Sequence, residues 1–178
     1  MRTVTYGAAC SLDGFIADAN GAVDWLHYSE DVTDVMAKYW STVDAILMGR
    51  KTWDVAAAAQ GESVDAGAFG EMKSYVFSRT LREIDRPGVT LVSEDPGAFV
   101  RRLKGQPGKG ICLLGGGELA GSLFEADVID EVGVNVHPIL LGAGVPLFRD
   151  PGRRIALELI ESRTIAGGCV LATYRVVH

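Results

Sequence analysis

A run of three glycines has the composition of a phosphate-binding turn. Gly115-Gly116-Gly117 follows the short apolar segment 111–114 and precedes a helical pattern that begins at Glu118-Leu119. In such a turn the backbone N–H groups approach a phosphate closely, and the N-terminus of the following helix adds a partial positive charge. An ordinary glycine turn would have the same composition. The run lacks the spaced glycines of the Rossmann fingerprint, so that fold is not favoured.

Two further segments place cations and hydroxyl groups directly after apolar, strand-like segments. Gly49-Arg50-Lys51-Thr52 follows residues 45–48, and Ser78-Arg79-Thr80 follows residues 75–77. In a sheet with parallel connections such strand ends lie along one edge, where open α/β sheets bind ligands. Any one of these arginines could instead be a solvated surface charge. Together, these two segments and the glycine run predict a site for a ligand with several phosphates.

Alternating strand and helix patterns are expected to position these segments. Ser29 can cap a helix that ends near Trp40, and Asp95-Pro96 is typical of another helix start. Helices are also expected after Gly49 and after the glycine run. Apolar runs predict buried strands at residues 4–9, 45–48, 75–77, 89–92 and 111–114.

The C-terminal part of the chain has a different pattern. Residues 131–136 and 155–160 alternate between apolar and polar side chains, and Gly167-Gly168 forms a turn within residues 165–177. These segments are interpreted as antiparallel strands. The sequence therefore predicts one α/β domain over residues 1–178. Its mixed sheet is mostly parallel, with an antiparallel C-terminal hairpin and helices on both faces.

Composition narrows the classes of function. The 178 residues are 48% hydrophobic, enough for one continuous core, and the net charge of −6 argues against nucleic acid as a partner. The three cysteines are widely spaced, which favours neither a disulfide framework nor a metal site. No apolar run reaches the roughly 18 residues of a membrane span, and no signal peptide follows Met1. A soluble, cytoplasmic protein with a small-molecule partner is expected.

In this order the motifs resemble the dihydrofolate-reductase-like superfamily, and most closely its riboflavin-biosynthesis reductase branch. The resemblance covers nearly the whole chain. It rests on the segments around the two basic strand ends and the glycine run, together with Ser11-Leu12-Asp13-Gly14-Phe15-Ile16-Ala17 and residues 138–148, which read PILLGAGVPLF.

The resemblance implies that NADPH binds along the strand ends. Its adenosine end and 2′-phosphate would contact Arg50, Lys51, Thr52, Ser78 and Arg79, with Gly49 and Thr80 beside them. The glycine run with Glu118-Leu119 would hold the diphosphate, and Ala9, Ile16 and Ala17 would lie against the nicotinamide. The residues themselves also favour NADP over NAD, because an NAD site would offer a carboxylate to the ribose.

Two carboxylates are candidates for catalysis under this resemblance. Asp13 belongs to an Asp-Gly pair that is characteristic of the riboflavin-type branch and would lie near the nicotinamide, although Asp-Gly is also a turn former. Folate reductases carry a carboxylate on the first helix, and Glu30, Asp31 and Asp34 compete for that place; Asp31 is taken as the candidate. Each of the three could instead simply stabilise the helix N-terminus.

The expected activity is NADPH-dependent reduction of a pyrimidine- or pteridine-like molecule, as in 5-amino-6-(5-phosphoribosylamino)uracil reductases. A dihydrofolate reductase is the alternative in the same class, and a non-catalytic NADPH-binding regulatory protein is the alternative in another. Deamination is not expected, because the zinc signatures His-x-Glu and Pro-Cys-x-x-Cys are missing. The resemblance also suggests a homodimer, in which the strand over residues 169–177 could pair at a sheet edge. A buried hairpin in a monomer would explain these apolar residues equally well.

Overall fold

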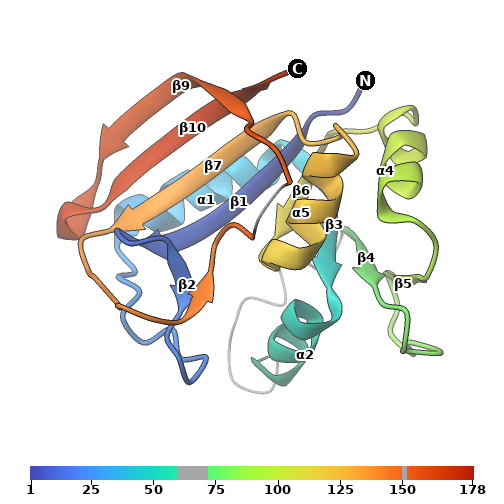
Figure 1. Cartoon of the computed structure of the whole chain (residues 1–178), viewed down its shortest axis with the longest axis horizontal. Coiled ribbons are helices and arrows are strands. Elements are labelled where there is room, and N and C mark those ends of the chain that lie inside the picture. The colour runs from blue at the N-terminus through green and yellow to red at the C-terminus, as the bar shows by residue number, and fades with distance from the viewer. Residues whose placement is uncertain (60–71, 150–151) are drawn as a thin grey trace.

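An eight-stranded sheet is the central layer of the computed structural model, which describes residues 1–59, 72–149 and 152–178 (Figure 1). Across the sheet the strands lie in the order β5-β4-β3-β6-β1-β7-β10-β9. The strands are β1 (Val4–Ser11), β3 (Val43–Gly49), β4 (Lys73–Phe77), β5 (Val89–Val92), β6 (Gly110–Leu114), β7 (Glu131–His137), β9 (Ala156–Thr164) and β10 (Val170–Val177).

Strand direction divides the sheet into two parts. The neighbours from β5 to β7 all pair in parallel. Strand β10 is antiparallel to both β7 and β9, and the 3₁₀ turn Ala166–Gly168 separates the last two strands in the sequence. The predicted mixed sheet with an antiparallel C-terminal hairpin is confirmed.

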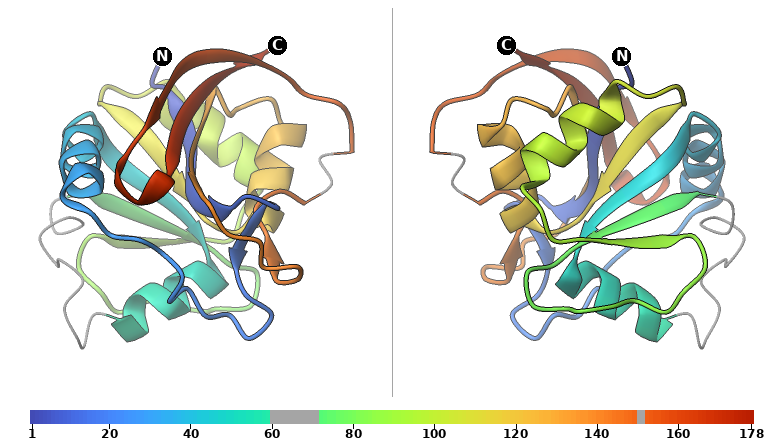
Figure 2. Two further views of the ribbon diagram at one scale, coloured as in Figure 1. Left: turned by 90° about the vertical axis from the view of Figure 1, so that its left-hand side faces the viewer. Right: turned by 90° about the vertical axis from the view of Figure 1, so that its right-hand side faces the viewer.

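Helices cover both faces of the sheet, as predicted. Helices α4 (Pro96–Lys104) and α5 (Gly117–Glu125) lie on one face, and α1 (Glu30–Ser41) and α2 (Arg50–Ala59) lie on the other (Figure 2). The predicted caps are present: Ser29 accepts a hydrogen bond from the Val32 amide, and Asp95 accepts one from the Ala98 amide. None of the described helices is both long and apolar enough to cross a lipid bilayer.

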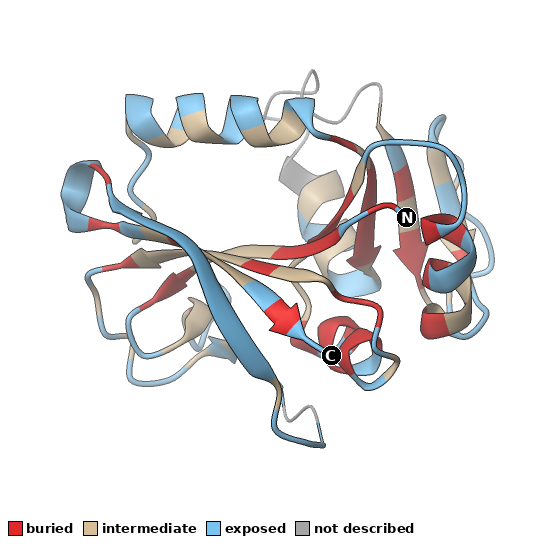
Figure 3. Cartoon of the chain, turned by 90° about the horizontal axis from the view of Figure 1, so that it is seen from above, coloured by how far each residue is buried: buried red, intermediate tan, exposed pale blue. Residues whose placement is uncertain are grey.

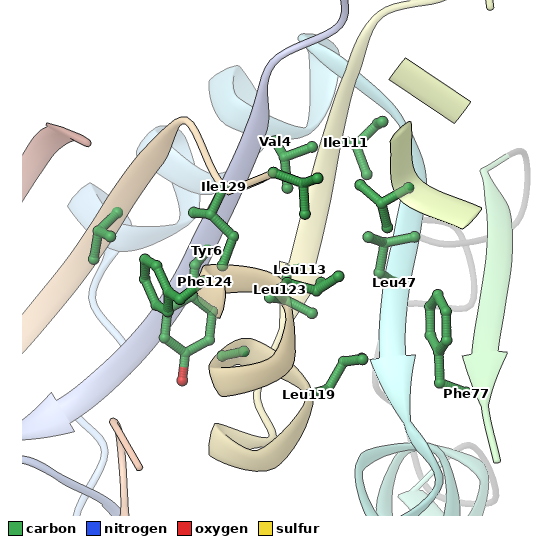
Figure 4. Packing of buried hydrophobic residues seen from close by; sticks show 14 of the residues in the cluster. Val4, Tyr6, Leu47, Phe77, Ile111, Leu113, Leu119, Leu123, Phe124 and Ile129 are labelled. Carbon is green, nitrogen blue, oxygen red and sulfur yellow. The ribbon is translucent and has the colours of Figure 1, made fainter. Parts of the chain in front are cut away.

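The main core fills the space between the sheet and α5. Val4 and Tyr6 of β1 point toward this face and meet Leu119, Leu123 and Phe124 of α5 (Figure 4). The Tyr6 hydroxyl donates a buried hydrogen bond of 2.6 Å to the carbonyl of residue 147. Because successive side chains of a strand alternate between faces, the neighbouring residues of β1 point toward α1 instead.

The C-terminal part differs from the predictions in two respects. Strand β7 was predicted to be antiparallel; it is antiparallel to β10 but parallel to β1, because α5 connects it to β6 as a crossover and a crossover gives parallel strands. Alternation of side chains does not encode strand direction. Residues 169–177 were expected at a sheet edge, but β10 pairs on both sides and β9 forms the edge.

A small second sheet ties two loops together. Strand β2 (Phe15–Ala17) pairs antiparallel with β8 (Val145–Pro146). Gly144 lies at this crossing with φ +155°, where an added Cβ would lie only 2.1 Å from the Ala17 carbonyl oxygen. Only glycine therefore allows the loop over residues 138–148 to approach the loop after β1 this closely.

Removing one partner of a largely buried ion pair is expected to destabilise the fold. Lys104 of α4 lies 2.7 Å from Asp130, whose carboxylate also accepts the Val4 amide of β1 at 2.8 Å. Asp130→Ala leaves the ammonium group without a counter-charge and should lower the free energy of unfolding by about 3 kcal/mol, measured by urea denaturation. Glu94→Ala, which breaks the exposed pair with Arg102, is the control and should change stability little. Equal losses of stability in the two variants would contradict the larger contribution assigned to the buried pair.

Candidate active site

Parallel pairing brings the predicted segments to one edge of the sheet. Strand β3 ends at Gly49 opposite Phe77 of β4, and Met48 lies opposite Leu114 of β6. The segments that follow these strands therefore leave the sheet side by side. The two basic segments and the glycine run therefore converge at one edge of the sheet, as predicted.

The two basic segments contact each other directly. The Arg50 guanidinium donates a hydrogen bond of 3.0 Å to the Thr80 hydroxyl, and it lies 3.3 Å from Asp54 one turn along α2. Ser78 Oγ accepts the amides of Thr80 and Leu81 and closes the turn after β4. Lys51 and Arg79 are exposed beside this contact. The cluster offers cations and hydroxyl groups to a ligand at the surface.

The glycine run forms a cradle next to this cluster. Gly115 and Gly116 have φ of +53° and +70°, and a Cβ added at Gly115 would lie 3.1 Å from Thr52 Oγ1 of α2. The first helical bond of α5 runs from the Ala120 amide to the Gly116 carbonyl, and no side chain caps this helix. The amides of the first turn have no partner within the helix, so they can bind an anion.

The remaining residues of this motif have structural roles. Gly117 is buried, and a Cβ there would lie 3.3 Å from the Leu147 carbonyl oxygen. Glu118 pairs with Arg149 at 2.9 Å, and Leu119 lies in the main core. Glu118 and Leu119 were predicted to bind the diphosphate, and only their backbone groups are available for that role.

Asp13 acts as a clamp between two loops. Its carboxylate accepts hydrogen bonds from the Ser11 hydroxyl at 2.6 Å, from the Gly142 amide at 2.7 Å and from the Leu141 amide at 3.2 Å. These bonds, led by the one from Ser11, lower the pKa of the Asp13 carboxyl group. An ionised carboxylate with three donors holds a loop in place but is a poor proton donor. Its predicted catalytic role stays a prediction.

The three residues predicted to lie near the nicotinamide occupy different surroundings. Ala17 is buried in β2 opposite Val145, and Ile16 packs against the main core. Ala9 lies on β1 and lines a cavity on the α1 face of the sheet. Of the three, only Ala9 lines this cavity.

A cavity of about 360 Å³ lies between α1 and the sheet. Its roof is formed by Val32, Val35, Met36 and Tyr39, and α1 has no buried residue although this face is apolar. Figure 3 shows the helix lying over one face of the sheet. Leu114, the residue directly before the glycine run, also lines the cavity. The cavity and the predicted phosphate cradle are therefore neighbours in the chain at Leu114 and Gly115.

Glycines at the centre of the sheet explain why the cavity exists. Gly7 of β1 pairs with Gly133 of β7, and the same row continues to Leu114 on one side and Thr173 on the other. A Cβ at Gly7 would have no heavy atom within 4 Å. Sequence reasoning missed these residues, although glycines inside strands, which often mark close approach of a ligand or backbone, were a usable signal.

None of the three acids expected on the first helix lines the cavity. Asp31 points to the turn between β9 and β10, where its carboxylate accepts the Ala166 amide at 3.2 Å. Glu30 and Asp34 are exposed. Helical periodicity explains this, because the positions that face the sheet are occupied by the apolar side chains of the roof. The catalytic role predicted for Asp31 has no support from its position.

Two histidines close one end of the cavity. His137 is buried, and its Nδ1 accepts the His27 amide and lies 3.4 Å from Cys169 Sγ. Burial, and to a lesser degree His27, lowers the pKa of the His137 imidazole, while burial raises the pKa of the Cys169 thiol. The side chains of His137 and Cys169 are therefore both neutral near pH 7 and serve packing at this end.

The strand order, the cationic strand ends and the glycine turn define an α/β protein of the dihydrofolate-reductase-like fold, in its riboflavin-biosynthesis reductase branch. Residues 2–171 match the family model of the RibD C-terminal domain. The chain therefore belongs to the RibD C-terminal domain family.

Relatives and solved structures agree with this membership. The uncharacterized protein YyaP of Bacillus subtilis is 34% identical over 181 residues, covering 98% of this chain and 95% of YyaP. A putative riboflavin biosynthesis protein from Shewanella sp. PV-4 has a TM-score of 0.80 at 27% identity, with 99% of each chain covered. A bifunctional deaminase and 5-amino-6-(5-phosphoribosylamino)uracil reductase from Thermotoga maritima shares the fold, with a TM-score of 0.71 at 15% identity. That match covers 99% of this chain and 57% of the Thermotoga protein.

The Asp13 clamp predicts a specific dependence of stability on pH. A lowered folded-state pKa means that the clamp stabilises the fold above the unfolded pKa of about 4 and that this contribution is lost as the pH falls through the folded value. Asp13→Asn should therefore be less stable than the parent protein near pH 7, and the two should converge in acid. Urea denaturation from pH 7 to pH 3 measures the difference. Asp24→Asn, at an exposed position of the loop between β2 and α1, is the control. A constant difference at all pH values would contradict the clamp.

Proposed function

We propose that this chain is an NADPH-dependent reductase that transfers hydride to a pyrimidine- or pteridine-like small molecule. The observation that carries the proposal is that a residue lining the cavity directly precedes the phosphate cradle in the chain. Leu114 lines the cavity and is followed directly by Gly115 of the cradle. A dinucleotide whose diphosphate lies on the cradle would place its nicotinamide end at the cavity beside Ala9.

The residues at the cofactor edge fit a 2′-phosphorylated dinucleotide. Arg50, Lys51 and Arg79 supply cations around the turn after β4, and Thr80 already holds the Arg50 guanidinium in place. The uncapped N-terminus of α5 suits the diphosphate. The exposed Asp54 beside Arg50 is the one acid that contacts this guanidinium among the described residues.

The chain itself has few chemical tasks in such a reaction. The cofactor supplies the hydride when it is bound. The Asp13 clamp and the β2–β8 pairing hold the loops beside Ala9, and the roof of α1 excludes water from the ring that is reduced. Orientation of the two reactants and a dry site account for much of the rate enhancement that a protein can supply here.

The alternative functions receive less support. A dihydrofolate reductase is expected to hold a carboxylate against the pterin, and Glu30, Asp31 and Asp34 do not line the cavity. A regulatory protein that binds NADPH without turnover has no need for a second cavity beside the predicted phosphate cradle. The cavity therefore favours an enzyme.

The cofactor assignment predicts a strong preference between two nucleotides. Calorimetric titration should show NADPH binding and much weaker NADH binding. Arg50→Ala should weaken the binding of NADPH by about tenfold or more, because a hydrogen bond to a charged phosphate is lost. It should change the affinity for NADH little. Arg102→Ala, on the distant helix α4, is the matched control. Binding of neither nucleotide by the parent protein would contradict the proposed function, and equal losses for both nucleotides would contradict the role of Arg50.

We also propose that the protein forms a homodimer through strand β9. Every residue of this edge strand is exposed, and Leu157 and Leu159, which share one face opposite Val176 and Tyr174, are 44% and 53% exposed. Apolar side chains on an unpaired edge favour association.

A double substitution tests this interface. Leu157→Glu with Leu159→Glu should convert a dimer to a monomer in analytical ultracentrifugation, because it buries charges at the contact. Val55→Glu, at an exposed apolar position of α2, should leave the dimer intact. A parent protein that sediments as a monomer would contradict the proposal.

A further inference from the structure

We infer that the cavity beneath α1 takes a neutral, planar heterocycle without a phosphate group, and that Asn135 selects it through a ring N–H. This inference rests on the proposed function and narrows its substrate class. It predicts that the substrate of this chain lacks the phosphate group of the substrate named for the Thermotoga reductase.

The shape of the cavity favours a flat ligand. Its floor is the Gly7–Gly133 pair, which projects no side chain, and its roof is the apolar face of α1. A ring can therefore lie against the backbone of two strands, with aliphatic groups of Val32 and Val35 above it. Glycines inside strands are typical of places where a ligand approaches the backbone.

The charges around the cavity do not suit a phosphate. The charged side chains among its described lining residues are Glu161 and Arg163, and both lie on the exposed edge strand β9. They stand two residues apart on one face, next to Thr173 and Leu171 of β10, so their charges offset each other. A phosphate dianion would lose hydration here without gaining a net positive partner.

The arginines that follow the loop over residues 138–148 could hold a substrate phosphate only if they lined the cavity. Arg149 pairs with Glu118 of α5, and Arg153 pairs with Asp127 and donates to the Phe124 carbonyl. Neither of them lines the cavity, and nor does Arg154, the third arginine of this segment. These contacts belong to the α5 face, so the cations that follow the loop over residues 138–148 serve the fold on the opposite side of the sheet.

Asn135 offers a polar contact inside the apolar cavity. It pairs with Ala9, two positions along the strands from the Gly7–Gly133 pair, and its Oδ1 is buried without a hydrogen-bond partner among the described residues. A buried acceptor without a partner costs free energy, and an N–H group of a bound ring would satisfy it. A site built in this way rejects analogues that lack the donor.

A matched pair of ligands tests the inference. NADPH binding is measured first, because its failure would count against the proposed function alone. With NADP⁺ bound, calorimetry then compares 5-amino-6-(5-phosphoribosylamino)uracil with its dephosphorylated counterpart. The dephosphorylated compound should bind about tenfold more tightly or better, because it places no charge in the cavity. Equal or tighter binding of the phosphorylated compound, or binding of neither, would overturn the inference.

Three variants test whether the ligand binds in the cavity. Gly7→Val adds a side chain where the free protein has open space, so it should keep the fold and NADPH binding and lose the dephosphorylated compound. Asn135→Leu should weaken the binding of that compound by about tenfold without changing NADPH binding. Arg163→Gln should leave its affinity unchanged. Unaltered binding in Gly7→Val, or selective loss of the phosphorylated compound in Arg163→Gln, would overturn the assignment.

Discussion

The two unlike faces of β1 determine how the rest of the molecule is arranged. On one face Val4 and Tyr6 join the core beneath α5, and on the other Gly7 and Ala9 leave the backbone bare. Because a strand alternates its side chains, the same segment is both the centre of the core and the floor of the cavity. Helix α1 can then lie over the sheet without filling the space beneath it.

Close backbone approach at glycines brings several loops together at one edge of the sheet. Gly115 faces Thr52 of α2, Gly117 lies against Leu147, and Gly144 lies against the Ala17 carbonyl. At each of these positions a Cβ would meet another atom at short range. The loops after three different elements thereby meet along one edge of the sheet, and the Asp13 carboxylate fastens two of them.

Charge is segregated in a way that matches the proposed chemistry. Cations gather at the edge where the adenosine end of a dinucleotide would lie, and the cavity beneath α1 has almost none. This division lets one surface hold phosphates while its neighbour stays apolar enough to exclude water from a ring being reduced. Membership in the RibD C-terminal domain family is compatible with it, since the bifunctional Thermotoga relative shares the fold at only 15% identity.

Local patterns in the sequence were enough to predict most strands, the caps Ser29 and Asp95, and the convergence of the glycine run with the basic segments. These features depend on side-chain periodicity and on neighbouring residues, which the sequence alone determined. The direction of β7, the edge position of β9, the clamp role of Asp13 and the Gly7–Gly133 floor were decided by the tertiary structure. Each depends on which distant segment lies opposite, and alternation along a strand specifies a face but neither a partner nor a direction.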